Sequence, residues 1–258
     1  MTTEATLANL DATWTALDAV AASLTPEQWA AQSLCPDWTM HGVVVHATSI
    51  EQILIGWPPG GDAPFAQIGP VHRELAAMTP DELLARFRDV VAQRRAELDA
   101  MGEDDFATTG PTPVGPATYA RFMDIRMFDN WVHERDIRVP LGIPGDDDGP
   151  TGESALDEVH QSLGYIVGKK IGLEDGKSIA FDLTGPVVRR MLVRVDGRAA
   201  VVDELPNPDA TITTDSLTFM LLACGRIDPE APIADGRVTW TGDDEIGGRA
   251  ARNLRFTI

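Results

Sequence analysis

The strongest chemical signal in the sequence is a pair of residues four positions apart, Asp129 and His133. In a helix this spacing places both side chains on one face, about one turn apart. At about 100° per residue, the same face carries the apolar residues Phe122, Ile125 and Val132, so the polar pair is directed at a core. A carboxylate in that position is costly unless it is paired or binds a cation. The pair is therefore a candidate for two ligands of one metal ion.

A third candidate ligand, His46, lies on the apolar face that Val43 and Ile50 form on an earlier helix. Two histidines and one carboxylate from two helices would make a three-ligand site with a position left for water or substrate, as in catalytic zinc and non-haem iron sites. The residues alone leave other interpretations open. His46 could be a core histidine bonded to a carbonyl group, and Asp129 and His133 could form an ordinary ion pair.

Four long amphipathic helices are expected to position these side chains. Each shows apolar residues at three- and four-residue steps, and threonines at positions 39 and 79 provide N-terminal caps for the second and third. Four such helices joined by loops predict a four-helix bundle. The expected helices cover about residues 7–24, 39–57, 79–101 and 116–139, with a short helix after Thr25.

An acidic loop at residues 145–150 marks a change in the pattern, and we place the domain boundary there, between 1–150 and 151–258. A helix from about Ser154 to Lys170 joins the two parts. Beyond it the hydrophobic period shortens to that of strands, which predicts a small α+β domain. The expected strands are 178–184, 191–195, 199–202, 210–213 and 237–241, and the expected helices are 215–223 and 243–254.

The composition also bears on the binding partners and the cellular location of the protein. The 258 residues include 40 acidic and 21 basic ones, a formal charge of −19 that repels phosphate backbones and anionic membranes. We therefore expect no nucleic-acid or membrane partner. Cys35 and Cys224 are far apart in the sequence, which argues against a disulfide framework and fits a reducing cytoplasm. Neither a secretory signal pattern nor an apolar run of about 20 residues is present.

Several motifs together resemble one known family. They are the CPDWT segment at 35–39 followed by His46, the segment 129–136, the GRID segment at 225–228, and Gly242 with Asp243. Over nearly its whole length the chain resembles the mycothiol-dependent maleylpyruvate isomerase family. That resemblance implies a two-domain protein, with a DinB-like metal-binding four-helix bundle followed by a small α+β domain similar to sterol-carrier proteins.

The resemblance also implies site residues. In the family a metal ion, usually zinc, is held at the positions of His46, Asp129 and His133, although glutamate is usual where this chain has Asp129. Arg226 matches an arginine that contributes to the cleft, where a guanidinium suits a carboxylate of substrate or cofactor. An alternative for Arg226 is a cation at a helix C-terminus with Gly225 as the cap. Asp136 could orient His133 or Arg135, or form an ion pair at the end of its helix.

The implied function is a metal-dependent enzyme with mycothiol as thiol cofactor or co-substrate. A thiolate activated at the metal would add to an electrophilic small molecule, as a cis-trans isomerase or an S-transferase. Cys35 is not expected to be the nucleophile, because the family's thiol comes from the cofactor. The alternatives are a non-catalytic small-molecule binding protein and a metal-dependent hydrolase. We expect a cytoplasmic monomer or homodimer.

Overall fold

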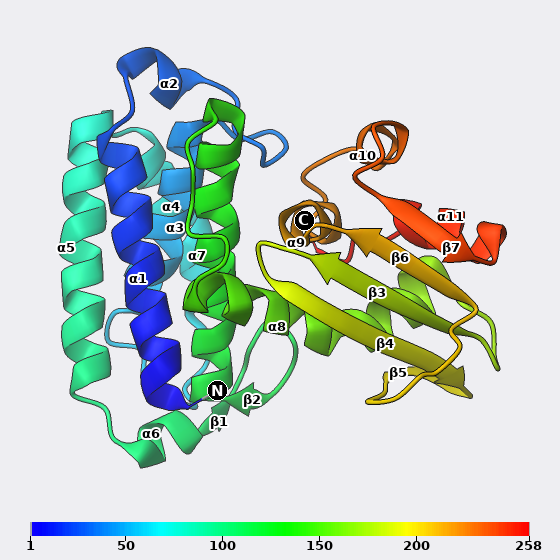
Figure 1. Ribbon diagram of the computed structural model, residues 1–258. Coiled ribbons are helices and arrows are strands. Elements are labelled where there is room, and N and C mark those ends of the chain that lie inside the picture. Colours follow the sequence, from blue (N-terminus) through cyan, green and yellow to red (C-terminus); the bar gives the residue numbers. More distant parts are fainter. Residues whose placement is uncertain (1, 258) are drawn as a thin grey trace. The chain divides into compact units, whose positions relative to one another are not determined.

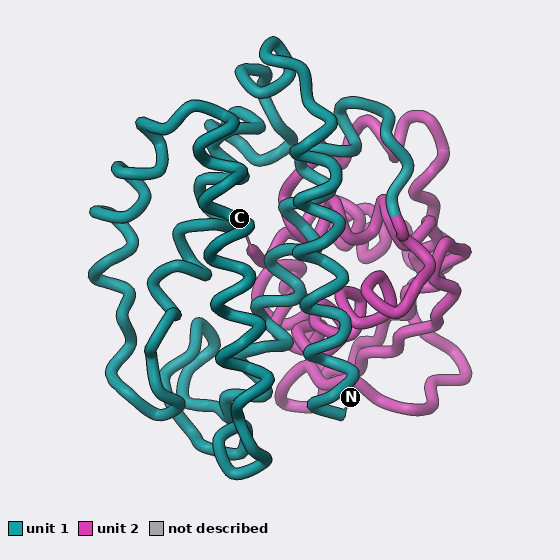
Figure 2. Tube along the Cα trace, turned by 90° about the vertical axis from the view of Figure 1, so that its left-hand side faces the viewer, with its two compact units in different colours: residues 1–145 teal, residues 146–258 magenta. Residues whose placement is uncertain are grey.

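The structure is a computed structural model that describes residues 2–257. Contacts within the chain divide it into two compact units, residues 1–145 and 146–258 (Figure 2). The division falls after Gly145, at the start of the acidic loop, five residues before position 150. The whole of helix α8, which begins at Pro150, belongs to the second unit.

The first unit is a four-helix bundle (Figure 1). Helix α1 contacts α5 and α7, and α3 contacts the same two helices, so the four surround one core. Large apolar side chains fill that core, including Trp14, Leu54, Phe87 and Phe122. The expected bundle is confirmed. Its helices are α1 (Thr3–Ala22), α3 (Met40–Leu54), α5 (Pro80–Asp99) and α7 (Tyr119–Leu141).

Threonine caps mark where all four of these helices begin, and Thr2 caps α1 by accepting from Ala5 N. The hydroxyl of Thr39 accepts from Gly42 N at the start of α3, and Thr79 forms a capping box with Glu82 at the start of α5. Thr118 caps α7, which therefore begins three residues later than the sequence pattern predicts. The helix passes Pro140 and ends at Gly142, whose φ of 64° suits glycine.

Shorter elements fill the connections of the first unit. Helix α2 follows Thr25 as expected, whereas a helix within the Gly/Pro-rich stretch after α3 is not predicted by the sequence pattern. Pro70 lies in the first turn of that helix, where a missing N–H costs little. These elements are α2 (Pro26–Ala30), η1 (Pro64–Gln67), α4 (Ile68–Ala76), α6 (Glu103–Ala107) and the two-stranded sheet of β1 (Thr109–Gly110) and β2 (Ala117–Thr118).

The second unit is an α+β domain built on a five-stranded sheet of order β5-β4-β3-β6-β7, and the expected fold class is confirmed. Strand β3 pairs antiparallel with β4 and parallel with β6, and Phe181 of β3 packs on Phe219 of α9. The strands are β3 (Ser178–Thr184), β4 (Val188–Asp196), β5 (Arg198–Val201), β6 (Ala210–Thr214) and β7 (Thr239–Gly242). The helices are α8 (Pro150–Tyr165), which continues as the π-helical segment η2 (Ile166–Ile171), α9 (Ser216–Ala223), α10 (Glu230–Ala234) and α11 (Asp244–Arg252).

Strand β4 begins three residues earlier than expected, because its backbone pairs with β3 from Val188 onwards, and two arginines at its start have acidic partners. Arg190 pairs with Asp182 on the neighbouring strand, and Arg189 pairs with Asp157 of α8. These charged residues interrupt the apolar alternation on which the strand prediction relies, although their backbone is paired with β3. Among residues 2–257, no helix has both the length and the apolar character needed to cross a bilayer.

Candidate metal centre

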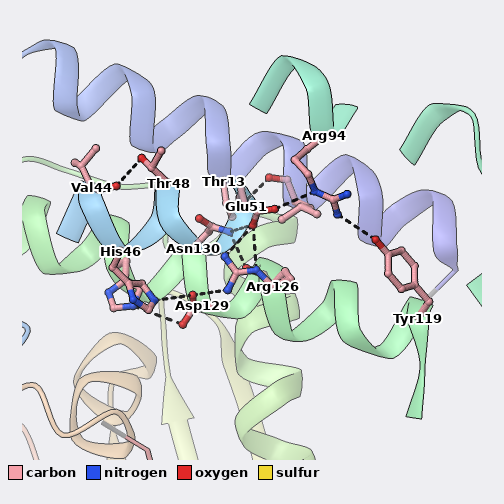
Figure 3. Close-up of polar contacts among 12 residues, drawn as sticks. Thr13, Val44, His46, Thr48, Glu51, Arg94, Tyr119, Arg126, Asp129 and Asn130 are labelled. Carbon is pink, nitrogen blue, oxygen red and sulfur yellow. Dashed lines mark hydrogen bonds and ion pairs between the residues drawn. The ribbon is translucent and has the colours of Figure 1, made fainter. Parts of the chain in front are cut away.

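The three candidate ligands meet between helices α3 and α7 of the bundle. His46 comes from α3, and Asp129 and His133 come from successive turns of α7 (Figure 3 shows His46 and Asp129). His46 Nε2 lies 3.4 Å from Asp129 Oδ2, and His133 Nε2 lies 3.5 Å from Asp129 Oδ1. One ligand atom from each residue lies within 4.8 Å of the other two. The structure thus brings together all three residues that the sequence singled out.

These spacings fit a shared ion. Zinc sits about 2.0–2.1 Å from nitrogen and oxygen ligands, so two ligand atoms of a tetrahedral ion are about 3.3–3.4 Å apart. The two separations measured here are close to that value, although each runs to a different oxygen of Asp129. The side chains of His46 and Asp129 are 22% and 30% exposed, whereas that of His133 is 5% exposed. The cluster is therefore reachable from one side, as a site with a position for a further ligand must be.

Asp136 holds the other nitrogen of His133. His133 Nδ1 lies 2.8 Å from Asp136 Oδ2, and the Asp136 side chain is fully buried. A carboxylate that accepts from Nδ1 directs Nε2 towards an ion and raises its donor strength. The structure thus places Asp136 in contact with His133, as an orienting role for its carboxylate requires.

Cys35 lies beside this pair and forms a second candidate group with His133 and Asp136. The 2.8 Å contact between His133 Nδ1 and Asp136 has the length of a hydrogen bond, which is shorter than the separation of two ligands on one ion. We therefore assign Cys35 and Asp136 to the surroundings of His133 rather than to a second metal site.

Trp38 covers one side of the two imidazoles. Its ring centroid lies 4.7 Å from that of His46 and 5.5 Å from that of His133, and it stacks on His133 with an interplanar angle of 30°. The loop that carries it is tied to α7, because Leu34 N donates to the carbonyl of Asp136. The contact of Trp38 with both candidate ligands depends on this loop, which no helical spacing reveals.

Burial and ion pairing set the charges of the cluster. Burial lowers the pKa of His46 below its ordinary value, although the hydrogen bond with Asp129 opposes this change. Burial would raise the pKa of Asp129, but the charges of Arg126 and His133 hold it well below its usual range. Burial likewise opposes protonation of His133, yet the charge of Asp129 and the bonds to Asp129 and Asp136 raise its pKa to about 9.

A buried ionic network adjoins Asp129 and was missed by the sequence reasoning. Arg126, one turn before Asp129 on α7, is 4% exposed and pairs with both Asp129 and the fully buried Glu51 of α3. A signal was present, because Arg126 falls about 60° from Asp129 around the helix and so shares its inward face. Glu51 likewise interrupts the apolar stripe of α3 between Ile50 and Ile53.

Comparison with known families shows to which family the chain belongs. Residues 10–138 match the profile of the mycothiol maleylpyruvate isomerase N-terminal domain, and residues 153–249 match that of the C-terminal domain of the same family. The chain belongs to the mycothiol maleylpyruvate isomerase family. The expected family is confirmed, and the two matched segments lie in the two compact units.

Solved structures and curated proteins are also similar to this chain. Crystal structures of the mycothiol-dependent maleylpyruvate isomerase and of a mutant of it match with TM-scores of 0.60 and 0.63, at 16% identity and over 93% of both chains, which shows a shared fold. Uncharacterized proteins of two Mycobacterium tuberculosis strains are 27% identical over 140 residues, which cover 49% of this chain. The chain spans about half the length of these curated relatives, 52% of each.

Arg226, the remaining site residue expected from the family, lies in the second unit just after α9. It is 7% exposed, and its Nη1 donates to the carbonyl of Cys224 (2.8 Å). Gly225 before it has a φ of 66°, as the helix-end alternative expects. Arg226 also lines a cavity of about 350 Å³ with Arg252 and Arg255. Asp228 also lines this cavity, and Arg252 is paired with Glu230. Arg226 therefore combines a helix-end position with access to a cavity lined by charges of both signs, and its role in the site stays a prediction.

Proposed function

We propose that this family member is an enzyme that binds a divalent metal ion, with zinc as the expected ion, and uses mycothiol as its thiol cofactor or co-substrate. The observation that carries the proposal is the convergence of His46, Asp129 and His133, each of which offers one ligand atom within 4.8 Å of the other two. Membership of the family supports mycothiol as the thiol. The shorter Asp129 in place of glutamate keeps the oxygen donor.

The donor set suits thiol chemistry. A cation held by these residues would lower the pKa of a thiol at its open position, so that the reactive thiolate forms at neutral pH. Around it, Asp136 fixes the ring of His133, and Trp38 shields one side of both imidazoles. Asp129 and His46 line the exposed side, where substrate would approach.

Two reactions use such a thiolate, and the second substrate in both is a small-molecule electrophile. In cis-trans isomerisation the sulfur adds to an activated carbon–carbon double bond, the resulting single bond rotates, and elimination of the same sulfur restores the double bond and the thiol. In S-transfer the carbon–sulfur bond is kept. The family name favours isomerisation.

The decisive test is metal content together with thiol-dependent turnover. Protein purified without added metal should contain about one divalent ion per chain, and His46→Ala should lose it. His41→Ala is the matched control, because His41 lies on the same helix but faces the carbonyl of Met78 at 3.1 Å. Stoichiometric metal retained by the His46 variant would overturn the ligand assignment.

Turnover separates the remaining alternatives. Consumption of an electrophile with mycothiol but not with a simple thiol supports the proposal, whereas equal rates with both would remove mycothiol from it. Hydrolysis without any thiol would indicate the hydrolase alternative. Tight binding of an apolar small molecule without any turnover would indicate a non-catalytic binding protein.

Arg226 is proposed to bind a carboxylate of substrate or cofactor. Arg226→Ala should raise KM for that partner, and an unchanged kcat/KM would return the residue to a structural role at the end of α9. A cytoplasmic location, a monomeric or homodimeric state and the lack of nucleic-acid or membrane partners stay predictions from composition.

A further inference from the structure

One oxygen of Asp129 is already engaged by a residue outside the ligand set. Arg126 Nη1 donates to Asp129 Oδ2 at 2.7 Å (Figure 3). The same guanidinium donates through Nε and Nη2 to Glu51 Oε1, at 3.0 and 2.8 Å. Arg126 therefore spans from a carboxylate of α3 to a candidate ligand on its own helix α7.

The far side of this bridge is fixed by further buried contacts. Arg94 Nε lies 3.4 Å from Glu51 Oε2, and both side chains are fully buried. Arg94 is held in turn by Glu97 Oε2 at 2.8 Å and by the hydroxyl of Tyr119 at 3.1 Å (Figure 3 shows Arg94 and Tyr119). Because Glu51 is anchored in the core, the guanidinium that it holds has little freedom to turn away from Asp129.

A carboxylate can bind a metal ion through one oxygen or through both. We propose that Arg126 is a positioning residue that restricts Asp129 to one-oxygen ligation, and that Glu51 holds Arg126 in the orientation this requires. Oδ2 stays with the guanidinium at 2.7 Å and also faces His46 Nε2 at 3.4 Å, so Oδ1 is the oxygen left for an ion. The inference rests on the proposed function, in which Asp129 is a ligand.

The guanidinium is suited to this role by its shape. Its planar fork carries donors that point in different directions, so Arg126 reaches Glu51 and Asp129 at once. A lysine at this position would keep the charge as a single donor centre without the fork. Charge alone therefore would not replace the restraint on Asp129.

The test is the visible absorption spectrum of the Co²⁺-loaded full-length protein, whose intensity falls as coordination rises from four to five. The variant Glu51→Gln with Arg126→Gln removes one charge of each sign, and Arg94 keeps Glu97 and Tyr119. We expect this double variant to bind one Co²⁺ with a clearly weaker spectrum, because both oxygens of Asp129 become available. A spectrum identical to that of the unmodified protein would overturn the inference.

Two further variants make the result specific. Arg126→Lys should show the same loss of intensity, and it decides the question if the double variant does not fold; an unchanged spectrum in it would contradict the role of the fork. The control Asp11→Asn with Arg95→Gln removes an exposed pair between α1 and α5 and should leave the spectrum unchanged. A spectral change in the control as large as that in the double variant would also overturn the inference.

Failure of the proposed function would look different. In that case the unmodified protein would bind no Co²⁺, or His46→Ala would bind it with an unchanged spectrum. Identical spectra for the unmodified protein and its Arg126 variants, with binding lost in His46→Ala, would overturn the positioning role alone. If the role of Arg126 were purely structural, its replacement would lower the melting temperature and leave the spectrum unchanged.

Discussion

Asp136 determines which nitrogen of His133 faces the cluster. Its carboxylate is fully buried and accepts from Nδ1, so Nε2 points towards Asp129. Such outer contacts matter for metal affinity nearly as much as the ligands, because they fix both the tautomer and the ring orientation.

We therefore expect Asp136→Asn to bind Zn²⁺ about 10–100-fold more weakly than the unmodified protein, as typical losses of such a partner do. Competition against a chromophoric chelator measures the change. Asp124→Asn is the control, because Asp124 lies on the same helix and accepts from the hydroxyl of Thr6 instead. Equal affinities for the Asp136 variant and the unmodified protein would show that His133 needs no such support.

At the level of residues, the sequence revealed the ligands but not what surrounds them. Helical spacing places Asp129 and His133 on one face, because that relation lies within a single helix. The contacts of Arg126 with Glu51 and of Trp38 with two imidazoles join separate elements, and no spacing rule covers them. The convergence of His46 with the other two was likewise a hypothesis until the packing of α3 on α7 was known.

At the level of elements, a polar latch joins the start of β3 to the residue before β6. Asp209 accepts from Ser178 N and Oγ, both at 2.9 Å, and from Lys177 Nζ at 3.0 Å. Partial burial opposes ionisation, but these hydrogen bonds lower the pKa of Asp209 below its ordinary value. The latch lies where two parallel strands must keep register.

This latch should make stability depend on pH. Because the folded pKa of Asp209 is lowered, its contribution is fully present above the unfolded value of about 3.9 and is lost as pH falls through the folded value. Asp209→Asn should therefore reduce the free energy of unfolding at pH 7, and this reduction should shrink as the pH falls below the unfolded pKa. Urea unfolding over a series of pH values measures the change in free energy. A reduction of the same size at every pH would show that the charge plays no part.

Elements with a regular hydrophobic period were predictable, and those without one were not. The four bundle helices and five strands follow from periodicity and caps. Helix α4 was missed because Gly69 and Pro70 in its first turn resemble a loop signal. Strand β4 was predicted too short because arginines occupy positions near its start.

At the level of the whole molecule, every proposed ligand and its supporting residues lie within one unit. His46, Asp129, His133, Asp136 and Trp38 all belong to residues 1–145, whereas Arg226 belongs to residues 146–258. Metal binding and the proposed recognition of a carboxylate are thus assigned to different parts of the chain.

Residues 1–145 produced alone should consequently fold as a helical bundle and bind one Zn²⁺ with an affinity close to that of the full chain. Circular dichroism and calorimetric titration check the two properties, and residues 146–258 serve as the negative control. A folded bundle fragment without metal affinity would show that the ligand set is incomplete within this unit.

The indole of Trp38, which contacts both imidazoles, also gives the protein an intrinsic optical reporter. A paramagnetic ion such as Co²⁺ at the cluster would quench the emission of so near a fluorophore, and replacing Trp38 with phenylalanine would remove most of that quenching. Occupancy could then be followed in real time, at micromolar concentrations and without a dye, while mycothiol or an electrophile is added.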